Sequence, residues 1–318
     1  MILISLAGGL FIIRITIFDY QSFDVITQTK RIREKSVIFP AISICGLNFT
    51  SDMIVSCLFE LKKCTLESFD YFRIPNGFFC LRFNGFHNES ISLERSWTSD
   101  WNYGLQLNLS SLSDVSYFEI YIQDNYLNNF DGVMPMYSYK KYLSNLFFVK
   151  SVDIKLDEPY NNCTKMENEN YRKVNCMKDC EEKLIIAKHN CYLPSFKAYA
   201  NSELKLCPDS YNLYLNKSVK EEFESICDKE CVNECHSIVY DTTHSGKMLD
   251  SLDDDSFLLY AFYADISYLK IVEIPKFNVE GLISSIGGTL SIFIGFKFLS
   301  LIEVVEFFIE VYFIQMGL

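Results

Sequence analysis

The chain has 318 residues, a formal net charge of −12 and 49% apolar residues. This acidic balance argues against a nucleic-acid partner, and a surface that attracts cations is its more natural use. Two long apolar segments indicate a membrane protein rather than a soluble enzyme. No catalytic motif stands in a plausible context, so we expect neither enzyme activity nor a cofactor.

The first apolar segment opens the chain, from Ile2 to Phe18, and Arg14 is its one charge. We predict a transmembrane helix over 1–18, with Arg14 reaching the membrane interface by its long stem. A cleaved signal peptide is the alternative, but no basic stretch precedes the segment and no small-residue cleavage site follows it. Because no cytosolic segment precedes Met1, we expect the N-terminus to be incomplete.

Several runs downstream alternate apolar and polar residues with a period of two, which is typical of antiparallel strands with one buried face. These runs are Leu105 to Leu109, Phe118 to Ile122 and Val152 to Leu156. A further strand is predicted over 267–274, and Pro275 ends it just before the second apolar segment.

All twelve cysteines lie between the two apolar segments. An even set in one region predicts an oxidising compartment and a disulfide framework, and hence an extracellular domain over 19–280. The same region carries five acceptor sequons for N-glycosylation, at Asn48, Asn88, Asn108, Asn162 and Asn216.

The cysteines of the second half repeat at intervals of four, so we expect one helix face to carry Cys176 and Cys180 and another to carry Cys227, Cys231 and Cys235. In antiparallel helices, paired positions have a constant sum of residue numbers. That rule favours a nested ladder of Cys163–Cys235, Cys176–Cys231, Cys180–Cys227 and Cys191–Cys207, although sequence alone does not fix connectivity. A zinc site that includes His236 is a weaker alternative, because this spacing does not suit tetrahedral ligation.

The second apolar segment, Leu282 to Ile302, carries one charge, Lys297. It is rich in glycine and serine, and small residues in a spanning helix allow close packing or line a water-filled path. We therefore predict a pore-lining helix over 281–313, followed by a cytosolic stub over 314–318. A lone charge in such a helix is a candidate functional residue.

Four motifs, in this order, resemble the epithelial sodium channel/degenerin family, which includes the acid-sensing channels. They are Phe39-Pro-Ala-Ile-Ser-Ile-Cys45, Gly77-Phe-Phe-Cys80-Leu-Arg-Phe-Asn84, Gly281-Leu-Ile-Ser-Ser-Ile-Gly-Gly288 and Gly295-Phe-Lys-Phe-Leu-Ser-Leu-Ile-Glu303. The resemblance covers nearly the whole chain, and the nested ladder is similar to the thumb domain of that family.

The resemblance implies two transmembrane helices that flank a large α+β, disulfide-rich extracellular domain with a β-sheet palm and a helical thumb at about 160–236. It also implies the disulfides Cys45–Cys80 and Cys57–Cys64. The chain is expected in the plasma membrane with both termini cytosolic, as one subunit of a homo- or heterotrimer in the lipid bilayer.

The resemblance further implies a sodium-preferring channel gated by the extracellular domain. Its filter falls on Gly295, Phe296 and Lys297, its gating positions on Ser284, Ser285 and Gly288, and a coupling aromatic on Tyr160. Where the family filter has serine, this chain has Lys297, whose charge would repel sodium. The alternative is therefore a non-conducting or regulatory subunit silenced by Lys297. Glu303 and Glu306 either concentrate cations at the inner pore end or lie on a solvated helix end.

Overall fold

The computed structural model describes residues 2–47, 49–65, 68–74, 78–85, 92–110, 117–127, 135–164, 171–192, 205–207, 217–250, 255–294 and 298–316. The chain divides into two compact units. The helical unit comprises residues 1–28, 158–161 and 273–318, and the strand unit comprises residues 29–157 and 162–272. Each unit is described by itself below.

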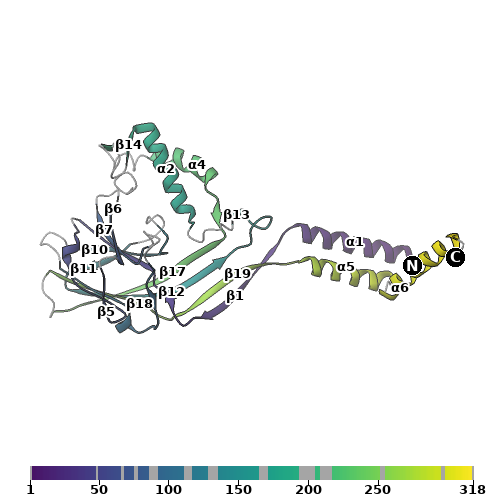
Figure 1. The fold of residues 1–318 in the computed structure, drawn as a ribbon, viewed down its shortest axis with the longest axis horizontal. Coiled ribbons are helices and arrows are strands. Elements are labelled where there is room, and N and C mark those ends of the chain that lie inside the picture. Colours follow the sequence, from purple (N-terminus) through teal and green to yellow (C-terminus); the bar gives the residue numbers. More distant parts are fainter. Residues whose placement is uncertain are drawn as a thin grey trace. The chain divides into compact units, whose positions relative to one another are not determined.

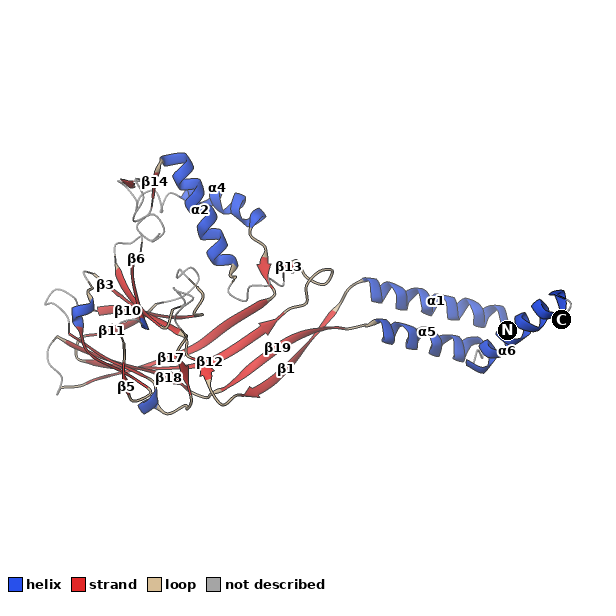
Figure 2. Cartoon of the chain, in the orientation of Figure 1, coloured by secondary structure: helices blue, strands red, loops and turns tan. Residues whose placement is uncertain are grey.

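The larger of the two main sheets has eight strands within the described ranges. Its strands, in spatial order, are β1 (Val25–Arg33), β19 (Ser267–Pro275), β12 (Tyr142–Ile154), β18 (Ser256–Tyr263), β9 (Leu105–Ser110), β4 (Ile54–Phe59) and β5 (Lys62–Lys63), and β17 (His236–Met248) also pairs with β12. The strands are drawn in red in Figure 2.

The second sheet has five strands in the described part of the chain: β11 (Met136–Tyr139), β10 (Tyr117–Gln123), β3 (Ala41–Gly46), β7 (Phe79–Phe83) and β6 (Phe69–Arg73). Short two-stranded pairs join β2 (Val37–Ile38) to β8 (Arg95–Ser96), β13 (Cys163–Thr164) to β16 (Asn233–Glu234), and β14 (Cys191–Tyr192) to β15 (Lys205–Leu206). Single 3₁₀ turns span Ser51–Met53 and Trp101–Tyr103.

The first two alternating runs form strands where the sequence predicts them, and the third is a strand only as far as Ile154, where β12 ends. Every apolar residue of the first run is buried in β9, and β10 buries Phe118, Ile120 and Ile122. The predicted strand directions are wrong in part, because β12 runs parallel to both β18 and β19. Alternation reports which face of a strand is buried and says nothing about the direction of its neighbour.

The main core of the strand unit is aromatic and includes side chains from both sheets. Phe39 is fully buried, and its ring lies 4.8 Å from that of Phe59 and 5.3 Å from that of Phe148, both edge-on. Its carbonyl oxygen accepts hydrogen bonds from the side-chain amides of Asn84 (2.6 Å) and Asn125 (2.8 Å). Phe39 and Asn84, which belong to two of the sequence motifs, are therefore in direct contact.

Two helices of the strand unit, α2 (Lys173–His189) and α4 (Lys217–Glu230), lie beside each other in Figure 1. Disulfides Cys176–Cys231 and Cys180–Cys227 tie them together, Cys191–Cys207 closes the loop beyond α2, and Cys163–Cys235 joins the segments at their other end. These are the pairs of the nested ladder. One expectation is wrong: α4 ends at Glu230, so Cys231 and Cys235 lie outside the helix, where the chain turns into β16.

Two further disulfides lie within the sheets. Cys45–Cys80 links the neighbouring strands β3 and β7, and Cys57–Cys64 lies across the turn between β4 and β5. These are the pairs that the resemblance implies. All twelve cysteines of the chain are therefore paired.

The helical unit contains α1 (Ile2–Gln21), α5 (Val279–Ile294) and α6 (Phe298–Met316). Helices α1 and α5 run side by side in Figure 1. Glycine makes their close approach possible, because a Cβ at Gly8 or Gly9 would lie 3.1 or 3.2 Å from the Phe293 side chain. Of the helices built from described residues, none combines the length and hydropathy needed to span a membrane.

We predict that Phe39→Ala lowers the free energy of unfolding by about 3–5 kcal/mol, because it leaves a cavity among rings that cannot collapse freely. The measurement is denaturant unfolding of the full chain with its disulfides intact. Val55→Ala, at an exposed position of β4, is the control and should cost less than about 0.5 kcal/mol. Equal losses for the two variants would contradict the assignment of Phe39 to the core.

Candidate functional site

The sequence-predicted coupling residue, Tyr160, lies in the helical unit near the end of α1. Helix α1 stops at Gln21, and Phe23 then adopts a left-handed backbone conformation with φ of 52°. This conformation is uncommon for a bulky residue. It accompanies an edge-on contact between Phe23 and Tyr160, whose ring centroids lie 5.6 Å apart at 88°. The aromatic at position 160 thus contacts the segment that leaves the first apolar helix.

Two polar contacts lie in the same unit. The backbone N–H of Lys276 donates to the Asp24 carbonyl oxygen (2.9 Å), and Lys276 Nζ donates to Asp24 Oδ2 (2.9 Å). Hydrogen bonding and charge attraction from Lys276 lower the pKa of Asp24. Asn161 Nδ2 also donates to Glu273 Oε2 at 2.7 Å. The segments after α1, around Tyr160 and before α5 are therefore bonded to one another.

The predicted gating positions lie on α5, where Ser285 is half-buried. Asn278 caps the start of α5, because its side-chain oxygen accepts from the Gly281 N–H at 2.7 Å. Thr289 is buried, and its hydroxyl donates to the Ser285 carbonyl oxygen at 2.8 Å. Ser284 and Gly288 are exposed, and no described atom lies within 4 Å of a Cβ placed at Gly288.

The predicted filter, Gly295, Phe296 and Lys297, lies outside the described residues. Glu303 and Glu306 are exposed on α6. Of the predicted glycosylation sites, Asn48, Asn88 and Asn216 lie outside the described residues. Asn162 is exposed, whereas Asn108 lies within β9, between β4 and β18.

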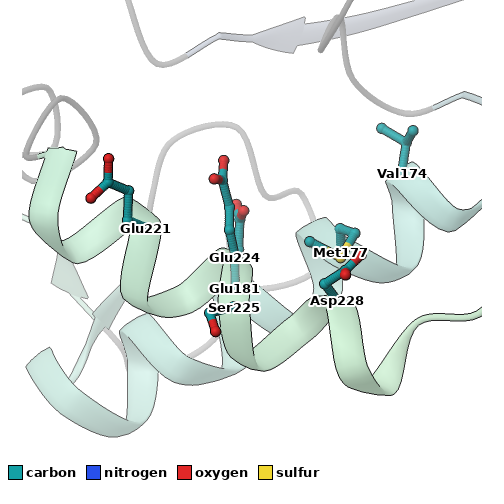
Figure 3. Close-up of a pocket in the computed structure, with 7 residues that line it drawn as sticks. All are labelled: Val174, Met177, Glu181, Glu221, Glu224, Ser225 and Asp228. Atoms are coloured by element: carbon teal, nitrogen blue, oxygen red, sulfur yellow. The ribbon is translucent and has the colours of Figure 1, made fainter.

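A groove of about 530 Å³ runs between α2 and α4 in the strand unit. Figure 3 shows its lining: Val174, Met177, Glu181, Glu221, Glu224, Ser225 and Asp228. Its carboxylates are partly neutralised, since Lys178 pairs with Glu181 at 3.2 Å and Lys173 pairs with Asp228 at 2.5 Å. Within the described ranges, no group of His, Cys, Asp or Glu is arranged to hold a metal ion.

One buried carboxyl of α2 titrates unusually. Glu182 is 6% exposed, and burial together with the charge of Asp179 raises its pKa to about 7. Its Oε1 atom has no hydrogen-bond partner in the described part of the chain. Because the pKa of Glu182 is about 7 in the folded chain and 4.5 for an ordinary glutamate, ionisation of Glu182 lowers the stability of the fold as the pH rises from 4.5 to about 7.

Sequence reasoning missed the partners of Tyr160 and the polar contacts beside it. Phe23 and Asp24 directly follow the first apolar helix, and Lys276 follows the Pro275 strand stop. The one sequence feature that could have pointed to these residues is their position at the ends of predicted elements. The partners themselves depend on how distant segments meet, which no local pattern encodes.

The fold defines a class of protein in which a disulfide-tied strand unit is inserted in the sequence between two apolar helices. The family model for amiloride-sensitive sodium channels matches residues 49–307. The chain therefore belongs to the amiloride-sensitive sodium channel family.

Two curated relatives are similar over most of the chain. The degenerin-like protein unc-105 of Caenorhabditis elegans is 20% identical over 302 residues, covering 80% of this chain and 34% of the relative. The epithelial sodium channel subunit gamma of Oryctolagus cuniculus is 25% identical over 310 residues, covering 81% of this chain and 46% of the relative. The chain thus spans between about a third and a half of the length of these relatives.

Among solved structures, a cryo-EM structure of a proton-activated chloride channel aligns with 92% of this chain and 91% of its own chain. The identity is 7% and the TM-score is 0.42, a likeness too distant to carry a conclusion.

We predict that Tyr160→Ala loosens the segment after α1, because an edge-on aromatic pair contributes about 0.5–1.5 kcal/mol beyond its buried area. The backbone amides of residues 22–25 should exchange with deuterium about 2- to 10-fold faster, measured by mass spectrometry on the full chain. Tyr160→Phe keeps the ring and is the matched control. Faster exchange in both variants would show that the ring contact is not what holds this segment.

Proposed function

We propose that the chain is a subunit of a sodium-preferring cation channel, with a trimeric pore gated by the extracellular strand unit. The observation that carries the proposal is the family match over residues 49–307, which includes most of the strand unit and the whole second apolar segment. The relative from Oryctolagus cuniculus is itself named as an epithelial sodium channel subunit.

The proposed topology has two membrane spans, over 1–18 and 281–313, with residues 19–280 outside the cell and both termini in the cytosol at the plasma membrane. The apolar composition of both segments supports it, as do the paired cysteines and the sequons confined between them. The exposed Asn162 is the described sequon that is best placed to carry a glycan in this topology.

The proposed pore lies along the face of α5 that α1 leaves uncovered. That face carries Ser284 and Gly288, and small residues there leave room for water and ions between subunits. In this arrangement the filter is Gly295, Phe296 and Lys297, and Glu303 and Glu306 concentrate cations at the inner end. The contact between Phe23 and Tyr160 passes movement of the strand unit to the helices.

A second candidate is a non-conducting or regulatory subunit of the same family. The observation that favours it is Lys297, which places an ammonium group where a filter offers partial negative charge to a dehydrating cation. In a heterotrimer, one lysine beside filters of other subunits would alter conduction without abolishing it. The two candidate functions assume the same fold and differ only in the effect that Lys297 has on conduction.

The test is a voltage clamp of cells that express Ser284→Phe, alone and combined with Lys297→Ser, in sodium and in potassium solutions. A bulky ring at position 284 should hold the pore open without the unknown stimulus. We expect a sodium-preferring current, and Lys297→Ser should increase it because it removes a positive charge from the ion path.

A current that appears only with Lys297→Ser would favour the silenced subunit. If both variants reach the cell surface and neither conducts, the homomeric channel is excluded. Ser291→Phe, at another exposed position of α5, controls for the effect of ring size.

A further inference from the structure

Arg172, the residue before α2, is held against the loop that follows β10 by a buried ion pair. Arg172 Nε donates to Asp124 Oδ2, and the two side chains are only 4% and 2% exposed. The Arg172 guanidinium also lies over the Tyr126 ring, 5.2 Å from its centroid. Asn175 Nδ2 donates to the Tyr126 carbonyl oxygen at 2.6 Å. Three contacts of different kinds therefore converge on the start of α2.

The loop that receives Arg172 is itself fixed to the five-stranded sheet. The carbonyl oxygen of Leu127 accepts from Arg82 Nη1 (2.7 Å) on β7 and from Gln123 Nε2 (2.9 Å) on β10. Arg82 in turn pairs with the buried Asp70 of β6 at 2.8 Å. Residues 124–127, the described part of this loop, are thus bonded to the sheet.

The position of Arg172 is unusual for a helix start. It occupies the residue before α2 and makes no capping hydrogen bond from its side chain. Positive charge at a helix N-terminus opposes the helix dipole, so this arginine does not stabilise the helix by itself. The partners that compensate for its charge include Asp124 and the Tyr126 ring, both in the loop that follows β10.

The helix pair has a second attachment of a different kind. Cys163–Cys235 joins the segments next to β13 and β16 covalently, and Lys173 N–H donates to Glu234 Oε2 at 3.1 Å beside it. The disulfides Cys176–Cys231 and Cys180–Cys227 keep α2 and α4 together as one body. The pair thus has one covalent attachment and one non-covalent attachment.

We propose that Arg172, Asp124 and Tyr126 form a latch that positions the α2–α4 pair against the five-stranded sheet. When the latch opens, the disulfide-linked pair moves as one body about the Cys163–Cys235 joint, while both sheets keep their structure. A buried ion pair suits this role, because separating its partners is costly and the closed state is therefore well defined. The inference does not depend on whether the chain conducts ions.

The test is hydrogen–deuterium exchange of the full chain with its disulfides intact, comparing the wild type with Arg172→Met and Asp124→Asn. The reporting amides are those of Asn175 and Cys176, which bond to the Arg172 carbonyl, and that of Leu127, which bonds to the Asp124 carbonyl. Asp124→Asn is nearly isosteric, so it reports even if Arg172→Met folds poorly. Lys173→Met is the matched control, since the neighbouring Lys173 pairs with the exposed Asp228.

We expect both latch variants to speed exchange at these amides by at least about tenfold, because each leaves a buried charge without its partner. Exchange in β12, β18 and α4 should change by less than about twofold, and the control should match the wild type. A merely structural role would instead speed exchange throughout the strand unit, and that outcome overturns the latch. Unchanged exchange in both variants, or an equal effect of Lys173→Met, overturns it as well.

Discussion

The packing of Phe39 between the two sheets is the contact on which the strand unit most depends. Its ring contacts Phe59 and Phe148 of the larger sheet, and its carbonyl binds amides from the ends of β7 and β10. Phe39 thus packs against the larger sheet through its ring, and its carbonyl oxygen holds the residues that follow β7 and β10. The loop after β10 begins beside Phe39, and Arg172, the residue before α2, bonds to Asp124 of that loop.

The six disulfides supplement this hydrophobic core in two places. Two lie within the sheets, and four stiffen a helix pair that has only a small hydrophobic core of its own. A covalent ladder keeps such a pair rigid without a large apolar interface. In the proposed latch, a helix pair with one covalent and one releasable attachment is suited to transmit a movement.

Much of this architecture can be predicted from the sequence, because alternation of apolar residues and the spacing of cysteines are patterns that the sequence shows directly. Alternation located β9 and β10, and the cysteine spacing gave the nested pairs. The direction of β12 and the helix end before Cys231 were predicted wrongly, since long crossovers and the β13–β16 pairing decide them. The bond between Arg172 and Asp124 joins residues 48 positions apart, and no period or motif marks it.

In the channel that we propose, copies of the chain converge around a pore at the small-residue face of α5. Because all twelve cysteines are paired, an introduced cysteine supplies the only free thiol. The most direct measurement is oxidative cross-linking in membranes of Gly288→Cys, on the uncovered face, against Thr289→Cys, which is buried. The account predicts covalent dimers with Gly288→Cys and monomers with Thr289→Cys. Monomers alone from Gly288→Cys, or equal cross-linking at the two positions, would contradict it.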